Sequence, residues 1–365
     1  MKPATLIALL ALAACNGKSD DNNESTDGTD GTDGSVDGSD GTLDGGTDSG
    51  ADGGADGGTD SGADGGADGG ADGSTGELTQ IEIPVEGYYP EGVAIDTTTG
   101  TLYVGSVGTG GIYAASLTDG AVSELLPAWG TGGSIVGMKF VGGSLWACSS
   151  PGDPTAAPSS LVQIDPSTGG ILASYPLELY TFCNDFVVSS AGDIYVTESY
   201  SSVVYHKGPA DAALTRWFDD SFYAPIPGAF GFNGVALTAD EGALLVGRMD
   251  TGDILRIPIG TDGAPGVASL DTIDTAVAYA GIDGMGWKDG VLYAVRDYQL
   301  VTLTDGAADG SWVSTPVDVF VDSPTTFDFD TAGDLWLVES QFSKYFDGDD
   351  TTNGVPPFRV VKVSL

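Results

Sequence analysis

The chain has 365 residues, with 53 Asp and Glu against 12 Lys and Arg, a single His and a net charge of -41. Such an acidic chain repels phosphates and anionic headgroups, which excludes binding to nucleic acids or membrane surfaces through basic patches. Three cysteines are too few for a disulfide-rich scaffold. Only residues 77–365 have the composition of a folded body, and we expect them to form one domain.

The chain begins with a segment typical of an exported protein. Lys2 precedes an apolar run from Thr5 to Ala14, which is too short to span a bilayer, since that needs about 20 residues. The sequence Leu-Ala-Ala-Cys ending at Cys15 resembles the lipobox of bacterial lipoproteins. This implies a signal peptide over residues 1–14 and lipidation of Cys15, with a plain secretory signal as the alternative. Asn16 follows instead of aspartate, so we expect a location in the cell envelope, at the outer membrane.

The next segment is a predicted tether over residues 15–76. From residue 19 it consists almost entirely of Asp, Gly, Ser, Thr and Ala, with an aspartate at every fourth position from Asp40 to Asp72. So few apolar residues cannot bury enough surface to offset the conformational entropy, which predicts disorder. An ordered calcium-binding repeat is the alternative, although the segment lacks the aliphatic positions of calcium-binding β-rolls and the final Glu of an EF-hand loop.

Residues 77–365 repeat one β-rich pattern six times: an apolar strand, a Gly or Asp turn, and a second strand with an aromatic residue or leucine. The repeats are 43 to 50 residues apart, and four show a clear third strand. This period is typical of β-propellers, so the sequence predicts an all-β, six-bladed β-propeller. The equivalent second-strand positions are Tyr103, Trp146, Tyr195, Leu245, Tyr293 and Trp336.

Two segments at the ends of this body predict how the ring of blades closes. Residues 78–85 form a strand without a blade of its own, and residues 358–365 form the last strand of the chain. Pairing these two strands in one blade would join the chain ends and remove exposed strand edges.

Cys148 and Cys183 are candidates for a disulfide. Cys148 ends the second strand of the second repeat, and Cys183 precedes the first strand of the third repeat. Both are therefore expected near the channel mouth, in adjacent blades. An oxidising compartment would permit the bond, which would also hold the neighbouring Asn184. Two separate buried thiols are the alternative, if their Cα atoms are more than about 7 Å apart.

Oxygen-bearing residues recur at the start of the first strand in four repeats. They are Glu91, Asn184, Asn233 and Asp283. A propeller brings the starts of its inner strands to the mouth of the central channel, so these side chains should converge there. Two carboxylates and two amides suit Ca²⁺, with Mg²⁺, Mn²⁺ or Zn²⁺ as alternatives, although the His and Cys ligands of structural zinc sites are missing. Turn formation by Asn-Gly and Asp-Gly pairs is the other explanation.

The motifs PEGVAID, NDFVVSSAGDIYVTES, NGVALTADEGALLVGR and DGMGWKDGVLYAV resemble the senescence marker protein, gluconolactonase and luciferin-regenerating enzyme family. The resemblance extends over most of residues 86–342 and implies a six-bladed propeller with a divalent metal in its channel. Carried over by motif, it implies Glu91, Asn184, Asn233 and Asp283 as the metal ligands. It also implies that Asp283 is the general base that activates water against a lactone carbonyl.

The chain departs from the family around the expected substrate. Phe182-Cys183 stands where the family often has an arginine before its Asn-Asp pair. Arg248 and Arg296 follow second strands near the same mouth and could bind an anionic group, and Glu198 occupies the corresponding place in the third repeat. The alternative is a ring of ion pairs that joins these residues with Glu339.

Other chemistries are disfavoured. His206, the sole histidine, falls on an outer strand, which argues against a Ser-His-Asp triad and a histidine-rich zinc site. The glycine clusters lack a phosphate-binding motif. The acidic loop over residues 347–353 is either a second calcium site or a solvated loop. We expect a monomeric, metal-dependent hydrolase that opens a small lactone or similar ester. The alternative is a non-catalytic propeller lipoprotein that binds a ligand or partner.

Overall fold

The computed structural model describes residues 77–128, 133–273, 281–307, 310–346 and 354–365. The predicted signal peptide, the predicted lipidation site Cys15, the predicted tether and the acidic loop over residues 347–353 lie outside the described residues. Within the described ranges, no helix is both long enough and apolar enough to cross a membrane.

The regular secondary structure of the described residues is nearly all β, and three of the sheets each consist of four consecutive strands paired antiparallel. The first contains β2 (Pro90–Asp96), β3 (Thr101–Ser106), β4 (Ile112–Ser116) and β5 (Val122–Leu126). The second contains β6 (Ser134–Val141), β7 (Ser144–Ser150), β8 (Ser160–Ile164) and β9 (Ile171–Pro176). The third contains β10 (Cys183–Val188), β11 (Ile194–Glu198), β12 (Val203–Lys207) and β13 (Thr215–Asp219).

A larger, eight-stranded sheet combines two further antiparallel runs. One run contains β14 (Phe232–Leu237), β15 (Ala243–Arg248), β16 (Ile254–Pro258) and β17 (Ser269–Ile273). The other contains β18 (Ile282–Lys288), β19 (Val291–Arg296), β20 (Gln299–Ala307) and β21 (Ser311–Pro316). The two runs meet at their outer strands, where a short parallel pairing aligns Thr272 with Ser311 and Ile273 with Trp312.

The last sheet joins the two ends of the body. β1 (Gln80–Ile83) pairs with β24 (Phe358–Val363), and β23 (Leu335–Glu339) and β22 (Pro324–Phe329) complete the sheet. The predicted pairing of the terminal segments is confirmed. β1 is shorter than the predicted strand because Pro84 has no N–H to donate to a strand ladder. Helical structure in the described residues consists of a 3-10 turn, η1 (Ser221–Tyr223), and α2 (Phe342–Phe346).

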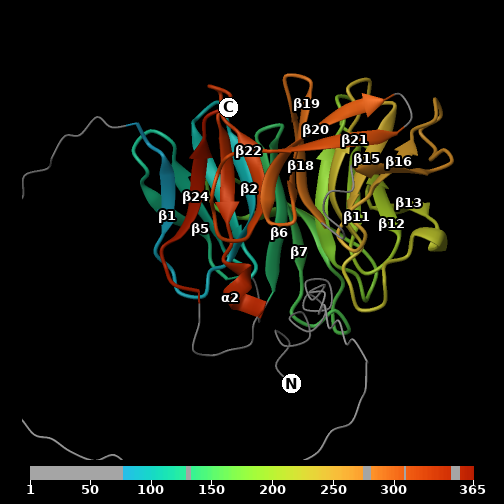
Figure 1. Cartoon of the computed structure of the whole chain (residues 1–365). Coiled ribbons are helices and arrows are strands. Elements are labelled where there is room, and N and C mark those ends of the chain that lie inside the picture. Colours follow the sequence, from blue (N-terminus) through green and yellow to red (C-terminus); the bar gives the residue numbers. More distant parts are fainter. Residues whose placement is uncertain (1–76, 129–132, 274–280, 308–309, 347–353) are drawn as a thin grey trace, which may run out of the picture. The chain divides into compact units, whose positions relative to one another are not determined.

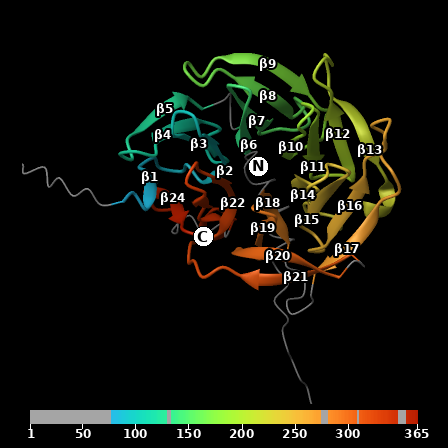
Figure 2. The same ribbon diagram turned by 90° about the horizontal axis from the view of Figure 1, so that it is seen from above.

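The first strand of every run lies toward the centre of the arrangement, with the later strands outside it (Figure 2). Contacts run from β2 to β6 and onward through β10, β14, β18 and β22, and β22 in turn contacts β2. These inner strands are covered on both faces, which explains why β2 and β14 are buried along their whole length. The outer strands β9 and β13 are partly exposed. Figure 1 shows the same sheets from the side.

Hydrophobic clusters fill the spaces between neighbouring sheets. Ile81 and Trp336 of the closing sheet, for example, share a cluster with Val93 and Leu102 of the first sheet. Each junction around the centre has a comparable cluster. The apolar face of every sheet is therefore buried against the next sheet, and the starts of the inner strands are held at fixed positions.

Candidate functional site

The inner strands share one irregularity near their starts. In each of them the register with the second strand shifts over two residues, which form a β-bulge. A bulge bends its strand and changes the direction of a side chain. The bulges span Glu91–Gly92, Val136–Gly137, Asn184–Asp185, Asn233–Gly234, Asp283–Gly284 and Thr325–Thr326. The four predicted metal ligands thus occupy one equivalent position, the first residue of the bulge.

The second residue of the bulge is glycine in four inner strands, and close packing explains why. A Cβ atom at Gly92 would lie 1.9 Å from the carbonyl oxygen of Val136, and a Cβ at Gly234 would lie 2.0 Å from that of Asp283. Both distances are far too short for any side chain. The Asn-Gly and Asp-Gly pairs therefore serve the close approach of neighbouring inner strands, and they do not form reverse turns.

The predicted ligands are largely enclosed. Glu91, Asn184 and Asn233 each expose 6% or less of their surface, while Asp283 is partly exposed. The Asn184 amide is held by a hydrogen bond from Nδ2 to the hydroxyl of Ser199 at 2.9 Å. Within the described part of the chain, Oε2 of Glu91 and Oδ1 of Asn233 are buried and accept no hydrogen bond. Each such oxygen costs about 1–3 kcal/mol unless a partner is supplied.

The pKa values of the two predicted carboxylate ligands, Glu91 and Asp283, are both raised. Burial, the charge of Asp283 and the charge of Asp185 raise the pKa of Glu91 well above its usual range. Burial and the charge of Asp185 raise the pKa of Asp283 to about 8, against the opposing effect of a hydrogen bond from Asn233. The site therefore holds more negative charge than its surroundings neutralise.

These residues fit a hard divalent cation. Carboxylate and amide oxygens are the ligands that calcium prefers, and a bound cation would satisfy the buried oxygens of Glu91 and Asn233. Among the described residues, no three His, Cys, Asp or Glu side chains gather as a metal-binding group. The fit therefore depends on combining the two carboxylates with the two amides of Asn184 and Asn233.

Three charged residues beside this set were not predicted as part of the site: Lys139, Asp185 and Asp328. Lys139 lies 3.4 Å from Asp185, measured from Nζ to Oδ1. Burial raises the pKa of both Glu91 and Asp328, and the charge of Lys139 partly opposes this rise. Lys139 and Asp328 each stand three residues after the first bulge residue of their strands, β6 and β22. A charged residue inside an otherwise apolar strand is the signal that points to them.

The residues predicted to bind substrate are engaged within the protein. Arg248 forms two hydrogen bonds to Asp250, 3.1 Å from Nε to Oδ1 and 2.8 Å from Nη2 to Oδ2. Glu198 is fully buried and accepts hydrogen bonds from the backbone N–H groups of Phe182 and Tyr200 and from the Ser201 hydroxyl. Its burial raises its pKa.

Arg296 and Glu339, the other charged residues predicted near the channel mouth, each end the second strand of their run. Arg296 is buried at the end of β19, and Glu339 at the end of β23 forms hydrogen bonds with Arg359. Arg248 and Glu339 thus pair within their own sheets, Arg248 with Asp250 and Glu339 with Arg359. The alternative of an ion-pair ring through Arg248, Glu198 and Glu339 has no support in these contacts.

A disulfide joins Cys148 to Cys183, with Cα atoms 5.2 Å apart. It links the end of β7 to the start of β10, directly before Asn184. An aromatic cluster adjoins it: Phe182 lies 5.6 Å from Tyr200 and 5.2 Å from Phe230 between ring centroids. Phe182, directly before the disulfide-bonded Cys183, is therefore packed among aromatic rings.

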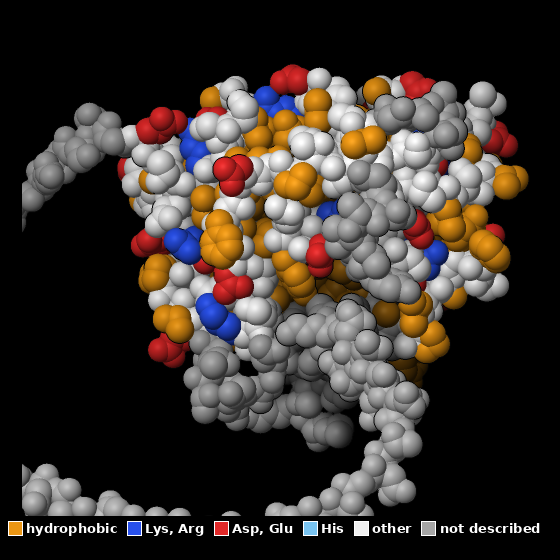
Figure 3. Space-filling model, viewed as in Figure 1, with side chains coloured by type: hydrophobic (Ala, Val, Ile, Leu, Met, Phe, Trp, Pro, Cys, Tyr) orange, Lys and Arg blue, Asp and Glu red, His pale blue; other side chains and the backbone are white. Residues whose placement is uncertain are grey.

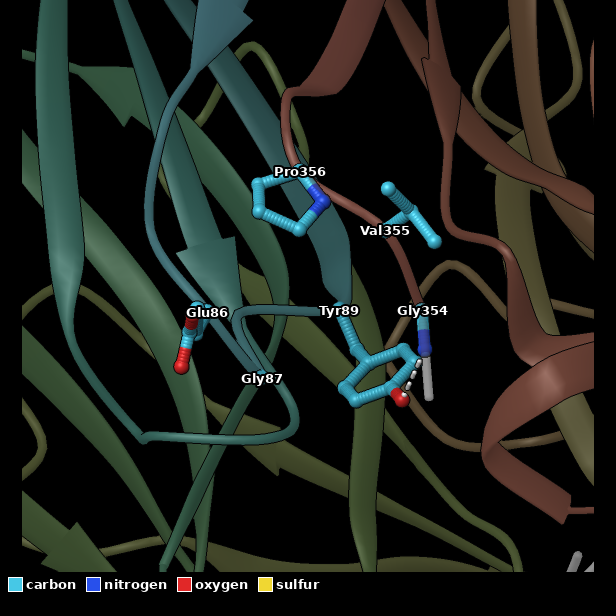
Figure 4. A pocket seen from close by; sticks show the side chains of 6 residues that line it. All are labelled: Glu86, Gly87, Tyr89, Gly354, Val355 and Pro356. Carbon is cyan, nitrogen blue, oxygen red and sulfur yellow. Dashed lines mark hydrogen bonds between the residues drawn. The ribbon is translucent and has the colours of Figure 1, made fainter. Parts of the chain in front are cut away.

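A pocket of about 510 Å³ lies beside the start of β2 (Figure 4). Glu86 and Gly87 line one side, and Gly354, Val355 and Pro356 line the other. The ring of Tyr89 stands between them, and its hydroxyl accepts a hydrogen bond from the backbone N–H of Gly354 at 2.7 Å. None of the four predicted ligands is among the described residues that line this pocket.

Acidic and basic side chains are interspersed over the face shown in Figure 3. Many basic residues in the described ranges form ion pairs with acidic neighbours: Arg216, Arg256, Lys288, Lys344 and Lys362 are examples.

The metal-free protein is expected to lose stability as the pH rises. In the folded state the pKa of Asp283 is about 8, whereas an aspartate in the unfolded chain releases its proton near pH 4. Between about pH 4 and pH 8 the folded state binds more protons, so raising the pH lowers the free energy of unfolding. Urea denaturation of chelator-treated protein at several pH values measures this slope. Asp283→Asn should reduce the dependence of the free energy of unfolding on pH. Asp119→Asn, at an exposed position, should leave this dependence unchanged. Equal slopes for the wild type and Asp283→Asn would contradict the raised pKa of Asp283.

Comparisons with known proteins identify the fold. No protein-family model matches the sequence, and no curated protein matches it. Solved structures do match. The major allergen Mala s 1 of Malassezia sympodialis has a TM-score of 0.63 at 12% identity, over 79% of this chain and 96% of the allergen.

Two further structures come from bacteria. A gluconolactonase of Xanthomonas campestris has a TM-score of 0.54 at 17% identity, over 78% of this chain and 89% of its own. Regucalcin of Agrobacterium tumefaciens, a calcium-binding protein, has a TM-score of 0.56 at 18% identity, over 78% of this chain and 94% of regucalcin. The body thus has the fold of propeller proteins of the gluconolactonase and regucalcin type.

Proposed function

We propose that residues 77–365 form a six-bladed propeller that acts as a metal-dependent hydrolase on a lactone or similar ester. The blade count follows if the eight-stranded sheet is two blades joined by the short pairing of β17 with β21. We further propose that Cys15 is lipidated and that residues 15–76 tether the propeller to the outer membrane, on the basis of the sequence pattern alone.

Glu91, Asn184, Asn233 and Asp283 would hold a divalent cation, with Ca²⁺ favoured by their oxygen donors. The observation that carries the proposal is the pair of buried, unpartnered oxygens on Glu91 and Asn233, at equivalent bulge positions of different inner strands. A bound cation would supply Lewis-acid polarisation of a carbonyl.

Asp283 is suited to handle the proton of the reaction. It is the predicted ligand that keeps part of its surface exposed, whereas Glu91, Asn184 and Asn233 are buried. The side chain of Asn233 partly opposes the rise in the pKa of Asp283 and so favours its ionised form. In its ionised form Asp283 would accept the proton of a water molecule that attacks the ester carbonyl.

The test is an assay of the purified protein on a panel of sugar, aliphatic and aromatic lactones, with and without Ca²⁺, Mg²⁺, Mn²⁺ and Zn²⁺. We expect turnover of at least one lactone that disappears after chelation and returns with the metal. Asp283→Asn should abolish it. Metal binding without hydrolysis of any lactone would contradict the enzymatic role.

A non-catalytic role in ligand binding is the second candidate. Its support is the internal engagement of Arg248 by Asp250 and of Glu198 by backbone N–H groups, which leaves these predicted substrate groups occupied. The pocket between Glu86 and Pro356 would then serve as a ligand site near the mouth. Ligand binding that persists in the Asp283→Asn variant would favour this function.

A further inference from the structure

Three aromatic rings, those of Phe182, Tyr200 and Phe230, pack against one another at the end of the sheets where β10 and β14 begin. The ring centroid of Phe182 lies 5.6 Å from that of Tyr200 and 5.2 Å from that of Phe230, and the last two are 5.8 Å apart. Such separations are typical of favourable aromatic pairs. Phe182 directly precedes β10, Tyr200 follows β11, and Phe230 precedes β14. We call these three residues the aromatic cluster.

Ser199 connects the aromatic cluster to Asn184 of the candidate site. Its hydroxyl accepts a hydrogen bond from Asn184 Nδ2 at 2.9 Å and donates one to the carbonyl of Phe232 at 2.6 Å. Its backbone N–H donates to the carbonyl of Phe182 at 3.1 Å, and its own carbonyl accepts a hydrogen bond from the N–H of Gly231 at 2.8 Å. The aromatic cluster therefore belongs to the same hydrogen-bonded unit as the Asn184 amide.

Glu198 fixes the backbone that carries two of the rings. Its Oε1 accepts hydrogen bonds from the N–H groups of Phe182 and Tyr200, both at 2.8 Å, and its Oε2 accepts one from the Ser201 hydroxyl. Hydrogen bonds to a carboxylate are stronger than those between neutral groups. The rings of Phe182 and Tyr200 are thus held in place before any ligand binds, which lowers the entropy cost of binding.

The aromatic cluster is buried on one side and partly open to solvent on the other. Phe182 belongs to the hydrophobic core between the second and third sheets, whereas Tyr200 and Phe230 are partly exposed. The loops that lead to β10 and β14 add exposed apolar side chains, Leu179 at 52% and Ile226 at 51%. A rigid aromatic surface beside a polar site is the combination that ligand sites use.

A basic side chain near the aromatic cluster is already engaged within the protein. Arg248 is the ladder partner of Phe232, and its guanidinium donates two hydrogen bonds to Asp250, whose side chain is fully enclosed. Asp250 also accepts a hydrogen bond from the N–H of Ile226, in the loop that leads to Phe230. Arg248 therefore stabilises this loop, and the surface favours a neutral apolar group over a carboxylate.

We propose that the aromatic cluster recognises the substrate and that the lactone or ester carries a neutral aromatic substituent. The inference rests on the proposed hydrolase and names its substrate class. The substituent packs against Tyr200 and Phe230, where it removes apolar surface from water. A sugar lactone gains less, because its hydroxyl groups lose hydrogen bonds to water at an apolar surface. Tyr200 and Phe230 are thus specificity-determining residues, and Glu198 is a positioning residue.

A matched pair of lactones tests the substrate class. γ-Butyrolactone and its phenyl-substituted counterpart share the ring that is opened and differ in the aromatic substituent. After correction for uncatalysed hydrolysis, we expect the wild type to show a kcat/KM at least about tenfold higher for the phenyl-substituted lactone, mainly through a lower KM. Equal values for the pair, or a higher kcat/KM for a sugar lactone, would overturn the aromatic substrate class.

Variants of Tyr200 test the surface itself. Tyr200→Ala removes a ring of the aromatic cluster and should reduce the preference for the phenyl-substituted lactone by at least about fivefold. Tyr200→Phe keeps the ring and should retain the preference. Phe320→Ala, which removes an aromatic side chain that is 99% exposed and outside the cluster, is the matched control and should also retain it. Equal losses on both lactones in Tyr200→Ala would assign Tyr200 a purely structural role.

Lactam binding separates this inference from the hydrolase. γ-Butyrolactam and its phenyl-substituted counterpart have the same rings but resist hydrolysis, so titration calorimetry of the wild type with Ca²⁺ requires neither turnover nor a variant. We expect the phenyl-substituted lactam to bind at least about tenfold more tightly. This result without hydrolysis of any lactone would overturn the hydrolase and support the aromatic surface. Equal affinities, or no binding of the phenyl-substituted lactam, would overturn the surface even in an active enzyme.

Discussion

Replacing Asp283 by Asn is expected to abolish the stabilisation of the folded protein by calcium. A ligand that binds only the folded state adds about 2.7 kcal/mol at a hundred times its dissociation constant. For a body of this size, that corresponds to a rise of roughly 5–10 °C in melting temperature. The variant loses one charged ligand, so calcium should no longer raise its melting temperature. Its metal-free form should be at least as stable as the wild type above about pH 7, because the change removes a charge that is costly to bury.

Thermal unfolding with calcium and with chelator measures this effect, and hydrolysis assays on the same samples should show a loss of at least about 100-fold. Asp328→Asn is the matched control, since both oxygens of Asp328 accept backbone hydrogen bonds. A calcium-dependent rise in Asp283→Asn equal to that of the wild type would remove Asp283 from the site.

Replacing Ile81 by Asp is expected to destabilise the propeller severely. Ile81 is fully buried in β1 and shares a cluster with Trp336 and Val338 of β23. The change removes apolar packing and places an unpaired charge in the closing sheet, which together should cost about 4 kcal/mol or more. Loss of β1 would also expose the edge of β24.

Urea denaturation gives the change in free energy of unfolding. The control is Glu82→Gln at the next residue, which is exposed and should change stability by less than about 0.5 kcal/mol. If Ile81→Asp unfolds at the same urea concentration as Glu82→Gln, then β1 does not contribute to closure of the body.

The repeats could be predicted because their pattern depends on local chemistry. Inner strands are covered on both faces, so they carry apolar stretches such as residues 93–95 of β2 and 235–237 of β14. The turns between strands favour Gly or Asp. The pairing of β1 with β24 could also be predicted, since each segment lacked a partner in its own repeat. The parallel pairing of β17 with β21 could not, because it involves two short outer edges and has no sequence signal.

The candidate site was harder to predict from the sequence than the fold. The shared position of Glu91, Asn184, Asn233 and Asp283 was visible, but the bulges that set their direction are register shifts between strands and leave no mark in a single strand. Asp185 was seen only as part of an Asn-Asp pair and received no role of its own, because its contact with Lys139 of another sheet is not visible in the sequence. Asp250, two residues after Arg248, was a local signal that could have been used.

The closing sheet also determines when folding can be completed. Gln80 of β1 pairs with Val361 of β24, so the two strands of this pair are separated by nearly the whole length of the body. Contacts of such long sequence range slow folding and leave strand edges open in the meantime. Truncation within β24 would make this open state permanent, and the free edges of β1 and β23 would then be available to pair with other chains.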